Sequence, residues 1–292
     1  MPELPEVQAL TTELSRRLSG RVLDRLEILA FPALKSYDPP LDVLLGATIT
    51  EVTRHGKYLD LHVRTVDDQQ LHLLIHLARA GWLRWRNAAP APMLRGPGKG
   101  PMAARLVLDD GSGLDITEAG TKKSLAISLV RSPDEVGGVA RLGPDPLDPG
   151  FTLEVFEGIL KSQGRAQIKG VLRDQSTIAG IGNAYSDEIL HAAKMSPFKA
   201  AEMGPDDAAR LYAALQSTLR AAIERADGVS ASELKGEKES NLRVHGRTGL
   251  PCPVCGDTVR QVIYADSTFQ YCPGCQTGGK PLADRVLSRL LK

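Results

Sequence analysis

The chain has 292 residues, of which 42% are hydrophobic and 4% aromatic, and its formal net charge is +1 at pH 7. This length suffices for two domains with proper cores, and there is no run of about 18 apolar residues, which excludes a membrane-spanning helix. Charged residues occur throughout the first 20 positions, so we expect no secretory signal and a cytoplasmic protein. Residues 241–292 carry seven Lys or Arg and three Asp, a net charge of +4 that is compatible with phosphate contact.

The chain begins Met1-Pro2-Glu3-Leu4-Pro5-Glu6, and apolar residues at positions 7, 10, 14 and 18 follow with the spacing of a helix. One interpretation is a helix start, because proline suits the first turn and acidic residues favour the positive end of the helix dipole. The other interpretation is catalytic. Removal of Met1 would leave a proline amine, and an N-terminal amine has a pKa of roughly 7.7–8, against roughly 10.4 for lysine. Such an amine can attack an electrophilic carbon and form an iminium, while neighbouring carboxylates move protons.

Short apolar segments separated by turn residues follow this helix, a pattern typical of β-strands. The turns Asp67-Asp68 and Asp109-Asp110-Gly111 predict hairpins, and the Pro/Gly-rich stretch from Asn87 to Pro101 predicts a mobile loop. Strands are expected at residues 21–28, 47–52, 58–64, 71–76, 82–86, 105–108, 114–117 and 125–130. Eight strands in about 110 residues predict a two-layer β-sandwich.

A second Gly/Pro-rich stretch, residues 137–150, is expected to lead into a helical half of the chain. Helices are predicted around Leu153, Phe156 and Leu160, and over residues 168–174, 183–193 and 206–226. The segment Ile178-Ala179-Gly180-Ile181-Gly182-Asn183 separates two of these helices. A helix that begins after glycines presents unpaired N–H groups that suit a phosphate, although glycines between helices are usually plain caps.

The four cysteines of the chain lie near its C-terminus, at Cys252, Cys255, Cys272 and Cys275. Two Cys-x2-Cys pairs separated by sixteen residues fit a tetrahedral four-thiolate zinc site. Two disulfides are the alternative, but the lack of a secretory signal favours zinc. Because four thiolates leave no position for water, one structural Zn²⁺ per chain is predicted.

Four features occur together: the Pro-Glu-Leu-Pro-Glu start, a β-rich first half, a Gly-Ile-Gly-Asn turn between helices and a four-cysteine ribbon. This combination resembles the bacterial, zinc-ribbon-containing type of the formamidopyrimidine-DNA glycosylase / endonuclease VIII family of base-excision repair enzymes. The resemblance extends from Pro2 to about Gln276. Residues 174–190, with Gly180-Ile181-Gly182-Asn183, resemble the family's helix-two-turn-helix motif, and residues 242–252 resemble the entry to its zinc ribbon.

The resemblance implies an α+β fold. Its parts are an N-terminal helix and catalytic β-sandwich domain over residues 1–131, a linker over 132–150, a helix-two-turn-helix DNA-binding domain over 151–245, a zinc ribbon over 246–276 and a C-terminal extension over 277–292. In that extension, Leu282, Val286, Leu287, Leu290 and Leu291 give a helix one apolar face, which would pack on the protein itself or bind a partner.

The resemblance also implies a bifunctional DNA glycosylase and abasic-site lyase that acts on damaged double-stranded DNA. Such an enzyme would be a monomer at the bacterial nucleoid and would need no small-molecule cofactor. Pro2 would be the nucleophile at the anomeric carbon, Glu3 would shuttle protons, and Glu6 would orient the amine or its partner. Lys57, which is otherwise simply an exposed strand-end lysine, would grip a phosphate beside the lesion. Asn183 and Arg247 would contact the DNA backbone.

Three departures from the family pattern bear on the substrate. Where a void-filling methionine is usual, His76-Leu77-Ala78-Arg79-Ala80-Gly81 offers Arg79, whose guanidinium plane would stack in the gap left by an extruded base. Residues 117–123 lack the Arg-Phe pair of guanine-lesion enzymes, and Asp266-Ser267-Thr268 stands where an arginine is usual. These changes favour oxidised pyrimidines, further-oxidised guanine products or abasic sites over a strict oxidised-guanine substrate.

Two other functions fit the same residues. The changed zinc hairpin favours a damage-binding protein of the same fold with little base excision. The missing Arg-Phe pair favours a specialised glycosylase for bulky or alkylated bases.

Overall fold

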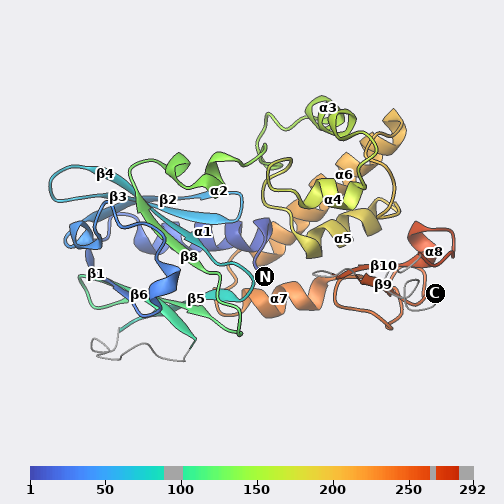
Figure 1. The fold of residues 1–292 in the computed structure, drawn as a ribbon. Helices are drawn as coiled ribbons and strands as arrows, with labels where there is room; N and C mark the ends of the chain where they lie inside the picture. The colour runs from blue at the N-terminus through green and yellow to red at the C-terminus, as the bar shows by residue number, and fades with distance from the viewer. Residues whose placement is uncertain (89–100, 264–267, 283–292) are drawn as a thin grey trace. The chain divides into compact units, whose positions relative to one another are not determined.

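The computed structural model describes residues 1–88, 101–263 and 268–282 (Figure 1). These residues form two compact units, residues 1–142 with 225–235, and residues 143–224 with 236–292 as far as they are described. Most of the predicted loop at 87–101, and the tail beyond Leu282, lie outside the described residues. Among the described helices, none is long and apolar enough to cross a membrane.

The first unit begins with helix α1 (Leu4–Leu18), as the sequence predicts. Glu3 is its N-cap and Pro5 lies in the first turn, where a missing N–H costs nothing. Val7, Leu10, Leu14 and Leu18 are all buried because their spacing places them on one face of the helix.

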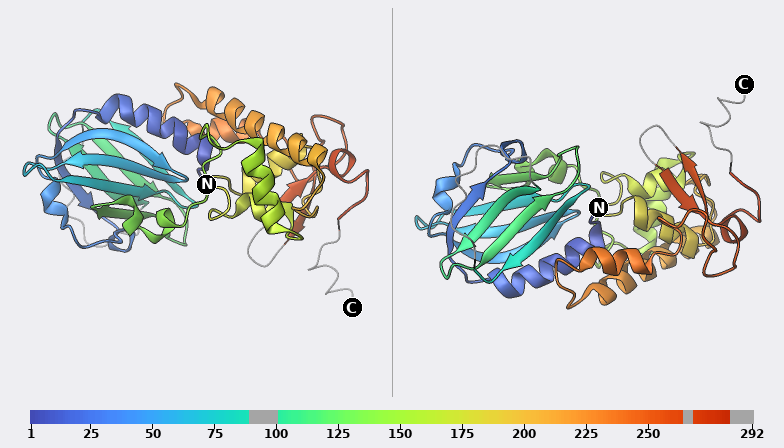
Figure 2. Two further views of the ribbon diagram at one scale, coloured as in Figure 1. Left: turned by 90° about the horizontal axis from the view of Figure 1, so that it is seen from above. Right: turned by 90° about the horizontal axis from the view of Figure 1, so that it is seen from below.

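Eight strands follow α1 and form two four-stranded antiparallel sheets, which confirms the predicted sandwich (Figure 2 views the sheets from opposite sides). One sheet has the order β2-β3-β4-β8 and the other β1-β6-β7-β5. The strands are β1 (Leu23–Ile28), β2 (Thr48–His55), β3 (Tyr58–Arg64), β4 (Gln70–His76), β5 (Gly81–Arg86), β6 (Met102–Leu108), β7 (Gly113–Glu118) and β8 (Ala126–Val130).

Alternation along β3 shows how the sandwich core forms. Leu59, Leu61 and Val63 belong to the core between the sheets, which also includes residues of α1 and of the second sheet. Successive side chains of a strand point to opposite faces, so Asp60 and His62 lie on the other face of this sheet. That face is partly covered by the short helices η3 (Pro133–Glu135) and α2 (Gly137–Ala140), through a cluster that includes Leu74, Val130 and Val139.

The second unit contains the helices predicted from the sequence: α3 (Leu153–Gln163), α4 (Ile168–Arg173), α5 (Asn183–Ala192) and α6 (Pro205–Ala226). The sequence did not predict α7 (Leu234–Asn241), the 3₁₀ turns η1 (Phe31–Ala33) and η2 (Leu41–Leu44), or the short helix α2 inside the expected linker. Residues 225–235, from the end of α6 to the start of α7, belong to the first unit, and Ala226, Ala231 and Leu234 join the sandwich core.

The C-terminal part of the second unit is a two-stranded hairpin, β9 (Arg260–Ile263) and β10 (Thr268–Tyr271), followed by α8 (Pro273–Gln276). Val262, Phe269 and Tyr271 form a small apolar cluster. Leu282 packs against it, and its backbone N–H donates to the Tyr271 hydroxyl at 2.7 Å. The first residue of the apolar face expected in the extension therefore packs on the protein itself, and the other four lie outside the described residues.

Candidate active site and metal centre

The N-terminal residues are held by a reciprocal cap on α1. The backbone N–H of Glu3 donates to Glu6 Oε2 at 2.8 Å, and the Glu3 side chain accepts from the backbone N–H of Glu6. Both side chains are almost fully buried, with 2% of Glu3 and 1% of Glu6 exposed, and Pro2 is buried next to an exposed Met1. Two buried carboxyl groups thus follow Pro2 within four residues, and the Pro2 nitrogen becomes an amine only when Met1 is removed.

Lys57 lies in the two-residue turn between β2 and β3, where Gly56 has a φ of +55°. Arg54 braces this turn, because its Nη1 donates to the Gly56 carbonyl at 3.0 Å. Its Nε also donates to Gln8 Oε1 at 2.9 Å, so one guanidinium joins the hairpin to α1. The hairpin that carries Lys57 is therefore fixed to the helix that carries Glu3 and Glu6.

His76 stands beside Lys57 and was not identified from the sequence. It pairs with Tyr58 across β3 and β4, and the two rings are 4.5 Å apart. Burial and the nearby charge of Lys57 lower the pKa of His76 to about 4, so its imidazole is neutral at pH 7. In the register of β3 and β4, His76 lies opposite Tyr58, the residue that follows Lys57. Knowledge of this register would have identified His76 from the sequence.

Two of the departures from the family pattern have definite local structures. Arg79 is exposed in the tight turn between β4 and β5, where a Cβ on Gly81 would come within 2.2 Å of the Leu77 carbonyl oxygen. Glu118, the last residue of β7, is buried, and its carboxylate accepts from the backbone N–H groups of Ser124 and Leu125 at 2.7 and 3.0 Å. Glu118 therefore organises the loop in which the Arg-Phe pair is missing.

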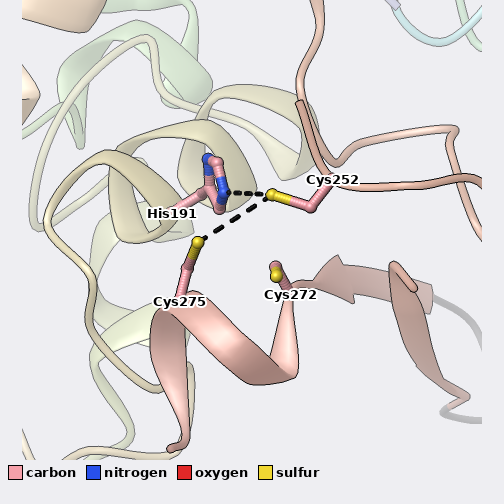
Figure 3. Close-up of side chains that lie close together, drawn as sticks. All are labelled: His191, Cys252, Cys272 and Cys275. Carbon is pink, nitrogen blue, oxygen red and sulfur yellow. Dashed lines mark hydrogen bonds between the residues drawn. The ribbon is translucent and has the colours of Figure 1, made fainter. Parts of the chain in front are cut away.

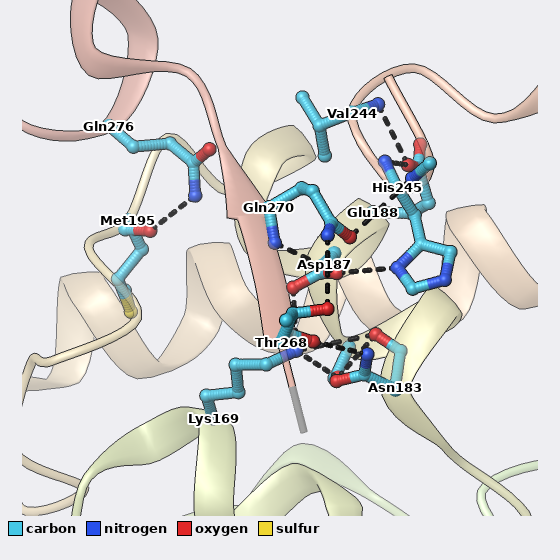
Figure 4. Close-up of polar contacts among 12 residues, drawn as sticks. Lys169, Asn183, Asp187, Glu188, Met195, Val244, His245, Thr268, Gln270 and Gln276 are labelled. Carbon is cyan, nitrogen blue, oxygen red and sulfur yellow. Dashed lines mark hydrogen bonds and ion pairs between the residues drawn. The ribbon is translucent and has the colours of Figure 1, made fainter. Parts of the chain in front are cut away.

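Asn183 is the first residue of α5, and its Nδ2 donates to the Thr268 carbonyl of β10 at 2.6 Å (Figure 4). Its Oδ1 is buried without a hydrogen-bond partner among the described residues. The side chain thus joins the start of α5 to the hairpin that lies between the two cysteine pairs.

A buried ion pair adjoins Asn183 and was also missed by the sequence reasoning. Lys169 Nζ lies 2.5 Å from Asp187 Oδ1, and 5% and 0% of these side chains are exposed. Asp187 Oδ2 also accepts from the backbone N–H of Gln270 at 3.2 Å and lies 2.7 Å from His245 Nδ1. This network fixes α4, α5, β10 and the segment before the cysteines in one arrangement.

Glu188 holds the same segment through backbone contacts. Its carboxylate accepts N–H groups from Arg243, Val244 and His245, each at 2.9 Å. Burial raises the pKa of Glu188, while the three N–H groups act in the opposite direction. Arg247, half-buried, donates from Nη2 to the Pro251 carbonyl at 3.4 Å, so part of its guanidinium supports the backbone before Cys252.

The four cysteines converge at the end of the second unit, with Sγ atoms 3.9 Å apart for Cys252 and Cys275 and 3.3 Å apart for Cys255 and Cys272. His191 of α5 joins them, because its Nε2 lies 3.3 Å from Cys252 Sγ (Figure 3). The ligand atoms of His191, Cys252, Cys272 and Cys275 all lie within 4.8 Å of one another. Cys255 is exposed, whereas His191 is 2% exposed.

Both halves of the chain match domains of known proteins. Residues 1–121 match the formamidopyrimidine-DNA glycosylase N-terminal domain, and residues 142–233 match the formamidopyrimidine-DNA glycosylase H2TH domain. A Heliobacterium modesticaldum protein named formamidopyrimidine-DNA glycosylase is 33% identical over 285 residues, which cover 94% of this chain and 100% of that protein. The chain belongs to the formamidopyrimidine-DNA glycosylase / endonuclease VIII family.

Two further proteins are similar to this chain, one over half of its sequence and the other over nearly the whole fold. An uncharacterized formamidopyrimidine-DNA glycosylase-like protein of Mycobacterium tuberculosis is 58% identical over 152 residues, covering 52% of this chain and 94% of that protein. The crystal structure of Lactococcus lactis Fpg (MutM) with DNA containing an oxidized pyrimidine has a TM-score of 0.79 at 26% identity. That match covers 94% of this chain and 100% of the Lactococcus chain.

The residues expected from the family resemblance fall into two groups, each within one unit. Pro2, Glu3, Glu6 and Lys57 belong to the first unit, together with the exposed Arg79. Asn183, Arg247 and the four cysteines belong to the second unit. Asp266 and Ser267, which stand where an arginine is usual, lie outside the described residues, and Thr268 begins β10.

Proposed function

We propose that this protein is a DNA glycosylase with abasic-site lyase activity that removes damaged bases from double-stranded DNA. The observation that supports this most directly is the cap of α1, which buries Glu3 and Glu6 directly after Pro2. Membership of the family and the DNA bound to the Lactococcus lactis relative support the nucleic-acid substrate.

The proposed reaction begins on the Pro2 nitrogen once Met1 is removed. Its lone pair forms a bond to the anomeric carbon as the bond from that carbon to the base breaks, and the base leaves with the electron pair and a proton. The sugar ring then opens to an iminium, with Glu3 moving the protons. Loss of a proton from the neighbouring sugar carbon expels the 3′ phosphate, and a second elimination expels the 5′ phosphate. Glu6 holds the backbone of Glu3 and so positions it.

In this proposal Lys57 and Asn183 hold phosphates of the damaged strand, and Arg247 adds positive charge before the ribbon. Phosphate contacts position a duplex without reading its sequence, which suits an enzyme that must act wherever damage occurs. Extrusion of the target nucleotide costs least for poorly pairing bases. We propose that the Arg79 side chain fills the gap that the extruded nucleotide leaves in the duplex. Arg79 is exposed on a tight turn that has no room for a side chain at Gly81.

We also propose that the four cysteines bind one structural Zn²⁺. With zinc–sulfur bonds of about 2.3 Å, two sulfurs of a tetrahedral site lie roughly 3.8 Å apart. The 3.9 and 3.3 Å separations are close to this value. Burial raises the pKa of Cys272 to about 11, so a cation is needed to keep this thiolate ionised at neutral pH. His191 would donate its Nε2–H to the Cys252 thiolate.

The substrate class rests on residues that differ from guanine-lesion enzymes. Glu118 ties down the loop that lacks the Arg-Phe pair, which favours oxidised pyrimidines, further-oxidised guanine products or abasic sites. The oxidized pyrimidine in the Lactococcus lactis complex is compatible with this class.

The test is borohydride trapping of the mature protein on duplex oligonucleotides carrying an abasic site, an oxidised pyrimidine, an oxidised guanine or no lesion. We expect a covalent adduct on the abasic site and the oxidised pyrimidine that is absent in Pro2→Gly, with slower trapping or none on the oxidised guanine. A wild-type protein that binds damaged duplex but gives no adduct on any lesion would instead be a damage-binding protein.

A further inference from the structure

A group of three histidines surrounds one buried carboxylate on the outer face of the β2-β3-β4-β8 sheet. Asp60 of β3 has no exposed surface. Its Oδ2 lies 2.9 Å from His55 Nε2, 2.9 Å from His72 Nδ1 and 3.4 Å from His62 Nε2. The strand register explains the grouping, because His62 pairs with His72 and both lie on the face of the sheet that carries Asp60.

The charge of Asp60 is balanced in an unusual way. Burial alone would raise the pKa of Asp60, but the hydrogen bonds and charges of the surrounding histidines lower it below its usual value. The ion pairs of Asp60 with described residues are all to histidine. A buried carboxylate needs its charge compensated, and no Lys or Arg among the described residues forms an ion pair with this one. A divalent cation bound by the group would compensate this charge.

The geometry of the group suits such an ion. One ligand atom each from Asp60, His62 and His72 lies within 4.8 Å of the others. For bonds of about 2.0–2.2 Å, two ligand atoms on a tetrahedral ion lie roughly 3.3–3.5 Å apart. The separations of 2.9 and 3.4 Å therefore need to change by only a few tenths of an ångström. Two imidazoles and a carboxylate are ligands that zinc and its neighbours in the transition series accept.

Neighbouring side chains are placed where they can support the metal ligands. His55 approaches the same Asp60 carboxylate, but it is not among the three residues whose ligand atoms all meet within 4.8 Å. Glu51 Oε2 lies 3.9 Å from His62 Nδ1, on the ring nitrogen opposite the one that faces Asp60. The charge of a carboxylate near that nitrogen favours the tautomer with its proton on Nδ1, which leaves Nε2 available to a metal. Thr53 Oγ1, 2.8 Å from His62 Nε2, would exchange that hydrogen bond for the ion.

We propose that Asp60, His62 and His72 form a second metal site, which binds a divalent transition ion such as Zn²⁺ with His55 and Glu51 as supporting residues. The site is independent of the cysteine cluster, which belongs to the other unit. It differs from it in chemistry as well, because its ligands are nitrogen and oxygen only. Three protein ligands leave a fourth position for water or an exogenous anion, unlike a closed four-thiolate site.

The experiment measures metal binding by the full-length protein after dialysis against excess Zn²⁺ and then against buffer, with the metal content determined by mass spectrometry. The tested variants are His62→Asn, His72→Asn and the double substitution. His76→Asn is the matched control, because it removes an imidazole from the same face of β4 but outside the ligand set. Cobalt substitution supplies a second readout, since a nitrogen and oxygen site lacks the thiolate-to-cobalt charge-transfer bands of the cysteine site.

We expect wild type and His76→Asn to bind one equivalent of metal more than the double variant. Each single variant should bind this ion at least 10-fold more weakly, and the Cys272→Ser variant should retain it. Equal metal content in wild type and the double variant would overturn the proposal, as would metal content that falls to zero in Cys272→Ser alone. If His72→Asn does not fold, His62→Asn decides, since 27% of the His62 side chain is already exposed.

Discussion

The backbone N–H of Glu3 donates to the Glu6 carboxylate at 2.8 Å, and this contact is part of the reciprocal cap that begins α1. The helix-start and catalytic interpretations of the first six residues are therefore compatible with each other. The same hydrogen bond that begins the helix fixes the backbone directly after Pro2. A nucleophile that must meet its target with a defined direction benefits from such a rigid support.

The two roles of Glu6 can be separated by substitution. Glutamine retains an acceptor for the Glu3 N–H, whereas alanine removes it. We expect Glu6→Gln to keep the stability of the wild type within about 0.5 kcal/mol but to slow borohydride trapping about 10²-fold, because the charge is lost. Glu6→Ala should also lower the free energy of unfolding by at least about 1 kcal/mol. Thermal unfolding and single-turnover trapping measure the two effects, and equal trapping by Glu6→Gln and wild type would limit Glu6 to its capping role.

Lys57 should contribute a phosphate contact that depends on salt. Arg54 ties its hairpin to Gln8 of α1, so the position of the lysine is set by the helix that carries the proposed catalytic residues. We expect Lys57→Ala to weaken binding to abasic duplex and to reduce the slope of log K against log salt by about 0.9. Lys35→Ala, an exposed lysine of the same unit, is the control. An unchanged slope in Lys57→Ala would place this lysine outside the DNA contact.

Local patterns predicted most of the fold. Helix α1 and the eight strands follow from apolar spacing and turn residues, and Tyr58–Arg64 has the predicted bounds. Such features depend on neighbours in the sequence, which is why a single chain reveals them. The helix α7 was missed because its sequence, Leu-Lys-Gly-Glu-Lys-Glu-Ser-Asn, is polar and contains a glycine that disfavours a helix.

Contacts between distant residues could not be predicted in this way. The hydrogen bond from Asn183 Nδ2 to the Thr268 carbonyl, 85 positions away, is one example. The Lys169–Asp187 pair and the place of His191 beside Cys252 likewise depend on how helices pack, which no periodicity encodes. The histidines around Asp60 required the pairing register of three strands, although each strand by itself was predicted.

Substitutions of the individual cysteines should have unequal effects on zinc binding. Cys272 is fully buried and lies within 4.8 Å of His191, Cys252 and Cys275, whereas Cys255 is exposed. We expect Cys272→Ser to abolish zinc binding at this site and to unfold the β9–β10 hairpin. Cys255→Ser should retain zinc with lower affinity, because His191 can take the fourth position, and the added His191→Phe substitution should then remove it.

Zinc content of the cluster and thermal unfolding of the same samples measure these effects. Val254→Ser is the control, because Val254 lies between the first two cysteines and 55% of it is exposed. Equal loss of zinc in Cys255→Ser and Cys272→Ser would show that His191 cannot replace a thiolate.

His76 predicts a pH dependence of stability. Burial and the charge of Lys57 lower its pKa to about 4 in the folded protein, below the value of 6.5 expected after unfolding. Between these values the unfolded chain takes up a proton that the folded protein does not, so acid favours unfolding. The contribution is fully present above pH 6.5 and is lost as the pH falls to about 4. At 1.36 kcal/mol for each pKa unit, the difference amounts to about 3 kcal/mol.

A His76→Gln variant isolates this contribution. Its free energy of unfolding, measured with urea at several pH values, should fall less steeply than that of wild type between pH 6.5 and about 4. Comparison with Lys57→Ala separates the two causes, because removal of the lysine charge should move the His76 pKa upward while leaving the effect of burial. Parallel curves for wild type and His76→Gln would mean that the pKa of His76 is the same in the folded and unfolded protein, and its imidazole would then add to the positive charge beside Lys57 only below about pH 6.5.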